Sequence, residues 1–201
     1  KMQRRQRKGS LKPRDSLKGP APNLDEENAK EELEVDVLCS KIENLNSVLE
    51  QPHVETLRAE GLMLGDLTVR KFLDFMCTKL SENKTLTELS LASNSLKPLH
   101  AEQIGKAIKL HPTLKRISLR DNDITTAGAN AMGKAAEGNF IVKQIDFDDN
   151  NLGPLFPMDL FLLPSLAKLE LYGNQLTEVP QKLMEISQLE DLDLRKNKIE
   201  I

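Results

Sequence analysis

The chain has 201 residues, of which 28 are basic and 31 acidic, so its net charge is −3. Aromatic residues make up only 3% and tryptophan is absent, which excludes a core built from large rings. No apolar run approaches the roughly 18–20 residues that cross a bilayer, and the Lys/Arg-rich start lacks the apolar segment of a signal peptide. We therefore expect a soluble protein located in the cytoplasm.

Residues 1–24 are expected to form a disordered basic tail. Up to residue 23 this segment holds eight basic residues against one acidic residue, and several Gly and Pro residues interrupt any regular pattern. Residues 1–18 are proposed to touch an acidic surface, and a solvated linker is the alternative. Nucleic acid is not the expected partner.

Residues 25–52 are predicted to form a helix. Acidic residues are frequent at the start of this segment, where the helix dipole favours negative charge. Farther on, Leu38, Ile42, Leu45 and Leu49 follow one another at steps of four, three and four, which is one stripe of an amphipathic helix. Because an array of repeats follows, we interpret this helix as an N-terminal cap that covers the first apolar face.

Residues 53–201 contain about six copies of one repeat. The copy from Leu86 to Leu96 has the spacing L-x-x-L-x-L-x-x-N-x-L, and this spacing returns at steps of 28, 28, 24 and 23 residues. The first copy is degenerate, with Leu62 at the asparagine position, and the last copy is truncated at Ile201. We expect such an uncapped end to belong to a longer protein or to be closed by a partner.

The segments between the motifs predict helices at 67–80, 101–110 and 126–137. Pro154, Pro157 and Pro164 disfavour a further long helix, because proline lacks the amide donor and clashes with the preceding turn. Short 3₁₀ or irregular turns are therefore expected from about residue 155 onward. Each motif itself predicts a short strand that pairs in parallel with its neighbours and points alternate side chains to opposite faces.

The repeats resemble the leucine-rich-repeat superfamily. The 28-residue copies are similar to the ribonuclease-inhibitor class, and the last two are similar to the shorter typical class. The resemblance implies an α/β solenoid with a curved parallel β-sheet on the concave side, and with helices and then short irregular turns on the convex side. The motif asparagines are expected to form a structural ladder of hydrogen bonds between adjacent turns, not a catalytic site. They are Asn94, Asn122, Asn150, Asn174 and Asn197.

The residues that flank the inward-pointing strand residues predict a partner-binding surface on the concave face. Acidic residues gather there in the later repeats, together with Tyr172, the only tyrosine in the chain. An aromatic ring with a polar tip is a common interface anchor, so we expect the surface to accept a basic element of a protein partner. A solvated polar face is the alternative. The predicted site consists of Arg116, Arg120, Asp146, Asp148, Glu170, Tyr172, Asp193 and Arg195.

Metal and cofactor sites are not predicted. Cys39 and Cys77 lack the Cys-x-x-Cys or Cys/His spacing of a zinc site, and we expect them to be buried thiols. His53, His100 and His111 are scattered singly and are expected at the surface or in loops.

The expected function is non-enzymatic. No Ser/His/Asp arrangement, phosphate loop or enclosed carboxylate pair stands out. The resemblance implies an interaction scaffold or assembly subunit of a cytoskeletal or ciliary complex. The alternatives are a small-GTPase regulator similar to the Ran GTPase-activating proteins, in which Arg120 would stabilise phosphoryl-transfer charge, and an actin filament-end cap similar to tropomodulin.

Overall fold

The structure is a computed structural model that describes residues 36–38, 47–66 and 77–200. All of these residues belong to one compact unit, Glu34–Ile201. The predicted basic tail, residues 1–24, lies outside the described residues, as does most of the predicted cap at 25–52.

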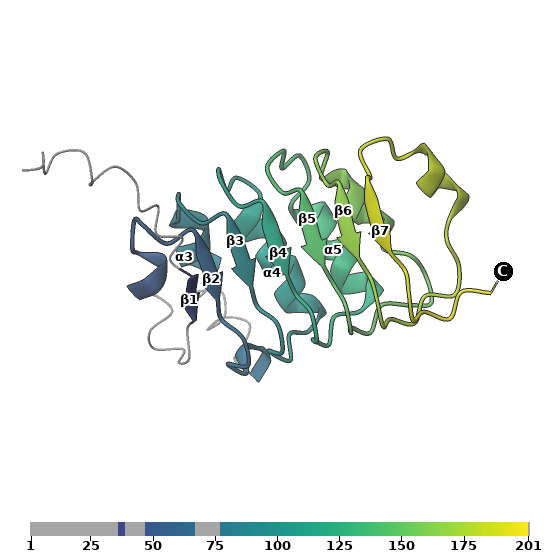
Figure 1. Cartoon of the computed structure of the whole chain (residues 1–201), viewed down its shortest axis with the longest axis horizontal. Helices are drawn as coiled ribbons and strands as arrows, with labels where there is room; N and C mark the ends of the chain where they lie inside the picture. Colours follow the sequence, from purple (N-terminus) through teal and green to yellow (C-terminus); the bar gives the residue numbers. More distant parts are fainter. Residues whose placement is uncertain (1–35, 39–46, 67–76, 201) are drawn as a thin grey trace, which may run out of the picture. The chain divides into compact units, whose positions relative to one another are not determined.

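The described residues contain a seven-stranded sheet in which the strands follow one another in chain order. The strands are β1 (Asp36–Leu38), β2 (Thr56–Arg58), β3 (Glu88–Ser90), β4 (Arg116–Ser118), β5 (Gln144–Asp146), β6 (Lys168–Glu170) and β7 (Asp191–Asp193). All neighbours pair in parallel, and Figure 1 shows them side by side. The sheet is open, with β1 and β7 at its two edges, and it confirms the predicted α/β class.

Strand β1 corrects the prediction of a helix over residues 25–52. Asp36 pairs with Thr56 of β2, so this part of the chain extends the sheet before the degenerate first repeat, whereas residues 47–49 are helical. Val35 and Val37 alternate with acidic residues at a period of two, which favours a half-buried strand. The free edge of β2 supplies the backbone partners for such a strand. The sheet therefore begins before residue 53.

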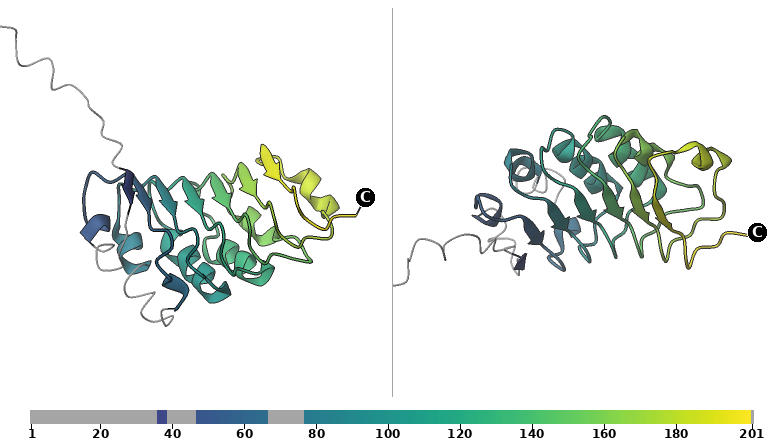
Figure 2. Two further views of the ribbon diagram at one scale, coloured as in Figure 1. Left: turned by 60° about the horizontal axis from the view of Figure 1, so that its bottom comes forward. Right: turned by 45° about the horizontal axis from the view of Figure 1, so that its top comes forward.

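Helices cover one face of the sheet (Figure 2). Helices α4 (Pro98–Ile108) and α5 (Thr126–Ala135) lie close to the predicted ranges. Helix α3 (Thr78–Glu82) overlaps the end of the range predicted at 67–80, and residues 67–76 lie outside the described part. Between residues 155 and 200 the helical elements are the 3₁₀ helices η3 (Met158–Leu162) and η4 (Gln181–Glu185), as the prolines predict. One further 3₁₀ helix, η1 (Leu64–Asp66), follows β2.

Leucine and isoleucine side chains fill the space between the sheet and the helices. Leu89, Ile117, Ile145 and Leu169, the middle residues of successive strands, are all buried. Glycine lets the helices approach closely: a Cβ atom at Gly105 of α4 would lie 2.5 Å from the carbonyl oxygen of Met132 in α5. Cys77 is buried as predicted, and desolvation raises the pKa of its thiol to about 12.

The motif asparagines join adjacent repeats through both side-chain atoms. Asn122 Nδ2 donates to the carbonyl oxygens of Leu91 and Leu119, at 3.1 and 2.9 Å. Its Oδ1 accepts hydrogen bonds from the backbone N–H groups of Asn94 and Leu96, at 3.1 and 2.8 Å. Bonds of the same two kinds are made by Asn94, Asn150, Asn174 and Asn197. Each ladder residue therefore satisfies backbone groups that the turns would otherwise leave without a partner.

A second ladder lies three residues before the first leucine of the motif. Asn139 Oδ1 accepts from the backbone N–H groups of Ile141 and Val142, both at 2.8 Å. Its Nδ2 donates to the carbonyl oxygen of Ile108 in the preceding repeat, at 2.7 Å. Asn83, 56 residues earlier, uses its Oδ1 and Nδ2 in the same way.

His111 occupies the middle position of this second ladder. Its Nδ1 accepts hydrogen bonds from the backbone N–H groups of Thr113 and Leu114, at 3.4 and 3.2 Å. The residue is only 1% exposed, and burial lowers its pKa to about 4, so the ring is neutral. Because Nδ1 accepts, the proton lies on Nε2, which has no hydrogen-bond partner among the described residues.

The prediction of a surface or loop position is therefore wrong for His100, which is buried within α4, whereas His111 does lie in a loop, after α4, but is buried there. Both side chains are buried, while His53 is exposed. His100 Nδ1 accepts from the backbone N–H of Lys97 at the start of α4, at 3.0 Å. The imidazole rings supply acceptors at positions where the backbone needs them.

Candidate functional site

The face of the sheet opposite the helices carries the predicted site, and we call it the open face. The middle residues of β2 to β7 pack into or against the core, so the two residues that flank each of them point to the open face. Strands β4 to β7 place Arg116, Asp146, Glu170 and Asp193 there. Arg120, Asp148, Tyr172 and Arg195 each lie two residues beyond a strand.

Three carboxylates gather at the centre of this face, from β5, β6 and the turn after β5. Asp146 accepts hydrogen bonds from the Ser118 hydroxyl at 2.7 Å and from the backbone N–H of Asp148 at 2.8 Å. Asp148 accepts one from the backbone N–H of Tyr172 at 2.8 Å. Glu170 accepts one from the side-chain amide of Gln144 at 2.9 Å. These bonds fix the carboxylates in place. We call Asp146, Asp148 and Glu170 the acidic centre.

The acidic centre carries negative charge that is costly to keep. Burial raises the pKa of Asp146, and it raises the pKa of Asp148 to about 6. The charges of Asp146 and Glu170 raise the Asp148 value further, while its bond to the Tyr172 backbone and the charge of Arg120 oppose the rise. The side chain of Asp148 is only 13% exposed, so water screens it weakly.

Arg120 lies beside the acidic centre and is held by two carboxylates. Its Nη2 lies 2.7 Å from Asp149 Oδ2, and its Nη1 lies 3.6 Å from Asp148 Oδ2. Asp149 has room for this pair because its neighbour in the next repeat is Gly173, where a Cβ atom would overlap Asp149 Oδ1. Gly173 also has a positive φ of 68°, which glycine adopts without strain.

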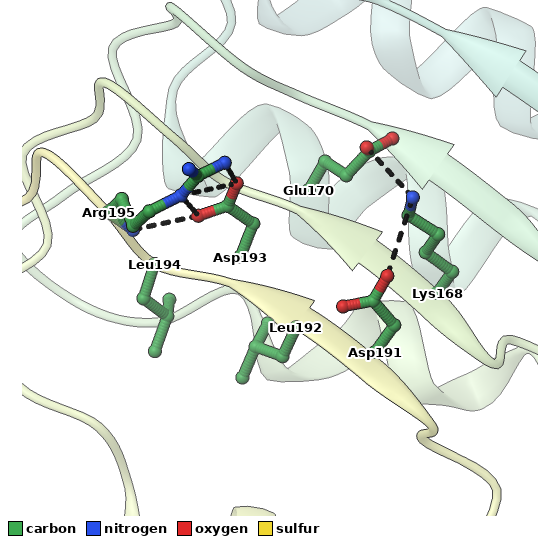
Figure 3. A pocket seen from close by; sticks show the side chains of 7 residues that line it. All are labelled: Lys168, Glu170, Asp191, Leu192, Asp193, Leu194 and Arg195. Atoms are coloured by element: carbon green, nitrogen blue, oxygen red, sulfur yellow. Dashed lines mark hydrogen bonds and ion pairs between the residues drawn. The ribbon is translucent and has the colours of Figure 1, made fainter.

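A second group of charges lies on β6 and β7, around a cavity of about 630 Å³ (Figure 3). Lys168 Nζ bridges Glu170 at 3.1 Å and Asp191 at 3.4 Å. Arg195 Nη2 lies 2.6 Å from Asp193 Oδ2, and this bond to Arg195 holds the pKa of Asp193 at about 2. In Figure 3, Leu192 and Leu194 point away from these ion pairs.

Tyr172 contacts cations rather than carboxylates through its ring. Lys196 Nζ lies 4.8 Å from the ring centroid and Arg195 Cζ lies 5.8 Å from it, within the range of cation–π attraction. Lys196 was not predicted as a site residue. It stands one residue before the motif asparagine Asn197, beyond the positions that strand alternation assigns to the open face.

The structure thus divides the predicted site into three parts. Asp146, Asp148, Glu170 and Arg120 lie together, and Tyr172, Asp193 and Arg195 form the neighbouring group. Arg116 instead pairs with Glu88 of β3. A groove of about 150 Å³ crosses the face from β2 to β6, and Arg58, Glu88, Arg116, Gln144, Asp146 and Glu170 are among the residues that line it.

The described residues provide no cluster of three or more His, Cys, Asp or Glu side chains suited to a metal ion. None of the helices in this part of the chain has the length and apolar character that crossing a bilayer requires.

Comparisons with known proteins agree with the repeat pattern. A family model described as a leucine-rich repeat matches residues 111–133. No curated protein sequence matches the chain at a significant level.

Two solved structures show the same arrangement of elements. One is leiomodin-1 actin-binding site 2; its TM-score is 0.55 at 19% identity, over 74% of this chain and 84% of that one. The other is the tropomodulin C-terminal domain of Caenorhabditis elegans; its TM-score is 0.57 at 13% identity, over 73% of this chain and 89% of that one. With its open parallel sheet, its repeated motif and these matches, the chain has a leucine-rich-repeat fold, as its sequence predicts.

Proposed function

We propose that the chain is a non-enzymatic interaction module that binds a basic element of a protein partner on its open face. The observation that carries this proposal is the acidic centre. Three carboxylates from β5, β6 and the turn after β5 meet there, and burial raises the pKa of Asp148 to about 6. A partner's Lys or Arg side chain would neutralise charge that the protein's own cations leave in excess.

The charge balance on this part of the face supports a basic partner. Its carboxylates outnumber its cations, and Arg120 and Lys168 each pair with two carboxylates. The acidic residues are Asp146, Asp148, Asp149, Glu170, Asp191 and Asp193, and the basic ones are Arg120, Lys168, Arg195 and Lys196. Complementary charge of this kind speeds encounter and excludes wrong partners.

The rigidity of the acidic centre also supports binding. Backbone N–H groups of Asp148 and Tyr172 hold the two aspartates, and Gln144 holds Glu170. The carboxylates therefore lose little conformational freedom when a cation arrives, which lowers the entropic cost of association.

A cytoskeletal partner is our specific proposal, and actin is the first to test. One of the similar structures is an actin-binding site of leiomodin-1, and the other is a tropomodulin domain. Neither a scaffold nor a filament-end cap needs catalytic groups. A role for Arg120 in a GTPase regulator has less support, because Asp148 and Asp149 already engage its guanidinium group. The basic tail, residues 1–24, would then offer a second contact in the cytoplasm.

Substitution of the acidic centre tests the proposal. The Asp146→Asn/Asp148→Asn variant removes two charges while keeping the side-chain shape and one acceptor oxygen at each position. We expect co-sedimentation with actin filaments, or capture of other cytoskeletal proteins from extract, to fall at least about tenfold, a loss of roughly 1.4 kcal/mol. Protonation of Asp148 below pH 6 should also weaken capture by wild type.

The matched control is Glu178→Gln/Glu185→Gln, which removes the same charge from two exposed positions. This variant should bind like wild type. Equal capture by all three proteins, at both pH 7 and pH 5, would show that the acidic centre binds no basic element.

A further inference from the structure

Two exposed apolar side chains lie in neighbouring turns at the edge of the array where the strands begin. Leu110, just after α4, is 87% exposed, and Phe140, between α5 and β5, is 68% exposed. Asn139 Nδ2 donates to the carbonyl oxygens of Ile108 and Lys109, at 2.7 and 3.3 Å. Leu110 and Phe140 each follow one of these bonded residues directly. Isolated exposed leucines are ordinary, but here two large apolar side chains are exposed in neighbouring turns.

The turns at this edge also carry four exposed lysines: Lys84, Lys109, Lys115 and Lys143. The backbone N–H of Lys143 donates to the carbonyl oxygen of Lys115 at 2.9 Å, so these two residues are neighbours in adjacent repeats. Lys84 directly follows Asn83, the ladder residue that corresponds to His111 and Asn139, so it lies at the same edge.

These four lysines have no ion pair among the described residues, whereas Lys79, Lys106, Lys134 and Lys168 all do. Three exposed acidic residues lie at this edge: Glu137 corresponds to Lys109, Glu82 corresponds to Leu110, and Glu50 lines a pocket with Lys84. Lys79 pairs with both Glu50 and Glu82, so the lysines still outnumber the acidic residues here. Glu55 and Glu190 occupy the register of Lys115 and Lys143, but Glu55 lies two strands from Lys115 and Glu190 lies two strands from Lys143. The edge therefore keeps a net positive charge in a chain whose net charge is −3.

We propose that this edge binds the surface of an anionic lipid bilayer. We call it the basic edge and define it as Lys84, Lys109, Leu110, Lys115, Phe140 and Lys143. Leu110 and Phe140 enter the boundary between headgroups and acyl chains, and the four ammonium groups contact lipid phosphates and carboxylates. The aliphatic stems of the lysines lie along the apolar boundary while their charges stay in water.

The shape of the pair favours a bilayer over an acidic protein segment. A protein partner would need preformed pockets for two protruding side chains, whereas a bilayer deforms around them at little cost. The charge pattern fits the same conclusion, because an excess of cations beside exposed apolar side chains matches a surface that is anionic outside and apolar beneath. The basic edge is separate from the acidic centre on the open face, so the two binding activities can fail independently.

Vesicle sedimentation of the full chain tests the proposal. We expect binding to phosphatidylcholine vesicles that contain phosphatidylserine, and little binding to phosphatidylcholine alone. Lys109→Gln/Lys115→Gln/Lys143→Gln and Leu110→Ser/Phe140→Ser should each weaken the partition coefficient at least about tenfold, since each lysine near such a surface contributes roughly fivefold. Circular dichroism confirms that the variants are folded.

The matched control is Leu99→Ser/Leu155→Ser, at positions 57% and 60% exposed. Leu155 lies at the other edge, because its carbonyl oxygen accepts a hydrogen bond from Thr126 at the start of α5, whereas Phe140 follows the end of that helix. This variant should bind like wild type. Because every variant keeps residues 1–24, any binding by the basic tail is the same in all of them.

Fluorescence then locates the contact. The chain has no tryptophan, so Phe140→Trp introduces a single reporter. Its emission should shift to the blue and be quenched by brominated lipid, while that of Leu155→Trp should not. Sedimentation without these changes, or equal binding by the lysine variant, would overturn the proposal. So would lysine-dependent binding of a polyglutamate peptide in the absence of vesicle binding.

Discussion

The repeats around β3 to β5 and those around β6 and β7 use different acceptors for the same backbone N–H group, in the turn before the strand. In the long repeats a side chain accepts the backbone N–H of the first motif residue: Asn83 for Leu86, His111 for Leu114 and Asn139 for Val142. In the short repeats the same positions hold Leu163 and Ile186. Their backbone carbonyl oxygens accept from Leu166 and Leu189, at 3.2 and 3.4 Å.

The difference follows from the element that precedes the strand. After an α-helix the chain must reverse direction, and a side-chain acceptor replaces the backbone groups that the reversal leaves unpaired. A 3₁₀ helix ends in tight turns whose own carbonyl groups bond three residues ahead. The 28-residue repeat therefore depends on polar side chains at two places in each turn, and the shorter repeat depends on them at one.

Removing core volume should show the largest difference between the two regions. Leu119→Ala should lower the free energy of unfolding by about 2–5 kcal/mol, because the side chain is fully buried and its loss leaves a cavity. Leu194→Ala, at the same motif position in the last repeat, should cost less than half as much, since Leu194 is only partly buried. Urea denaturation measures both. Equal losses would contradict the assigned register.

Removing the second ladder should have the next largest effect. Asn139→Ala should destabilise the protein by about 1–3 kcal/mol, because the buried N–H group of Val142 and the half-buried N–H group of Ile141 lose their acceptor. Asn139→His copies the residue found at 111 and keeps an acceptor, so its cost should be smaller. If thermal unfolding shows both variants to be equally destabilised, hydrogen bonding is not what this position provides.

The smallest effect at neutral pH is expected at His111. His111→Asn should stabilise the protein by about 1 kcal/mol at pH 7, because the amide can also donate to the carbonyl oxygen of Leu80, as Asn139 does to Ile108. Unfolding at pH 7 and pH 5 measures the gain. An unchanged free energy of unfolding would indicate that the unpaired Nε2–H costs nothing.

The difference in unfolding free energy between His111→Asn and wild type should increase as the pH falls. The pKa of His111 is about 4 in the folded protein and near 6.5 when unfolded, so wild type loses stability as pH falls from 6.5 toward 4. At pH 5 this loss is about 2 kcal/mol. Asp148 acts in the opposite sense, because its raised pKa makes the folded state bind protons more readily. Both proteins carry Asp148, so its contribution cancels in the comparison.

Sequence reasoning succeeded where the repeat restricts residue type. The motif leucines and asparagines, the helices at α4 and α5, and the change to 3₁₀ turns all follow from spacing and proline. It failed at β1, because the stripe from Leu38 to Leu49 outweighed the shorter alternation at Val35 and Val37. It missed the role of His111 because no motif marks that position. The 28-residue period that separates Asn83, His111 and Asn139 would have identified it.

The candidate site was harder to predict than the fold. The pattern placed Asp146, Asp148 and Glu170 on one face, because strand alternation determines which residues share a face. It did not show that Arg195 would turn back to Asp193, or that Lys196 would lie over Tyr172. Such contacts depend on side-chain rotamers and on the left-handed backbone at Lys196, neither of which the repeat spacing specifies.

Gly173 has a consequence for how this protein tolerates change. An alanine there would push the Asp149 carboxylate aside. Because Asp149 is the closest partner of Arg120, a substitution at 173 would change the position of an arginine two repeats away with which it makes no contact. The effects of changes at 120, 149 and 173 should therefore not add. A substitution at one of these positions restricts which residues the other two can accept. We therefore expect the three positions to change together among related sequences.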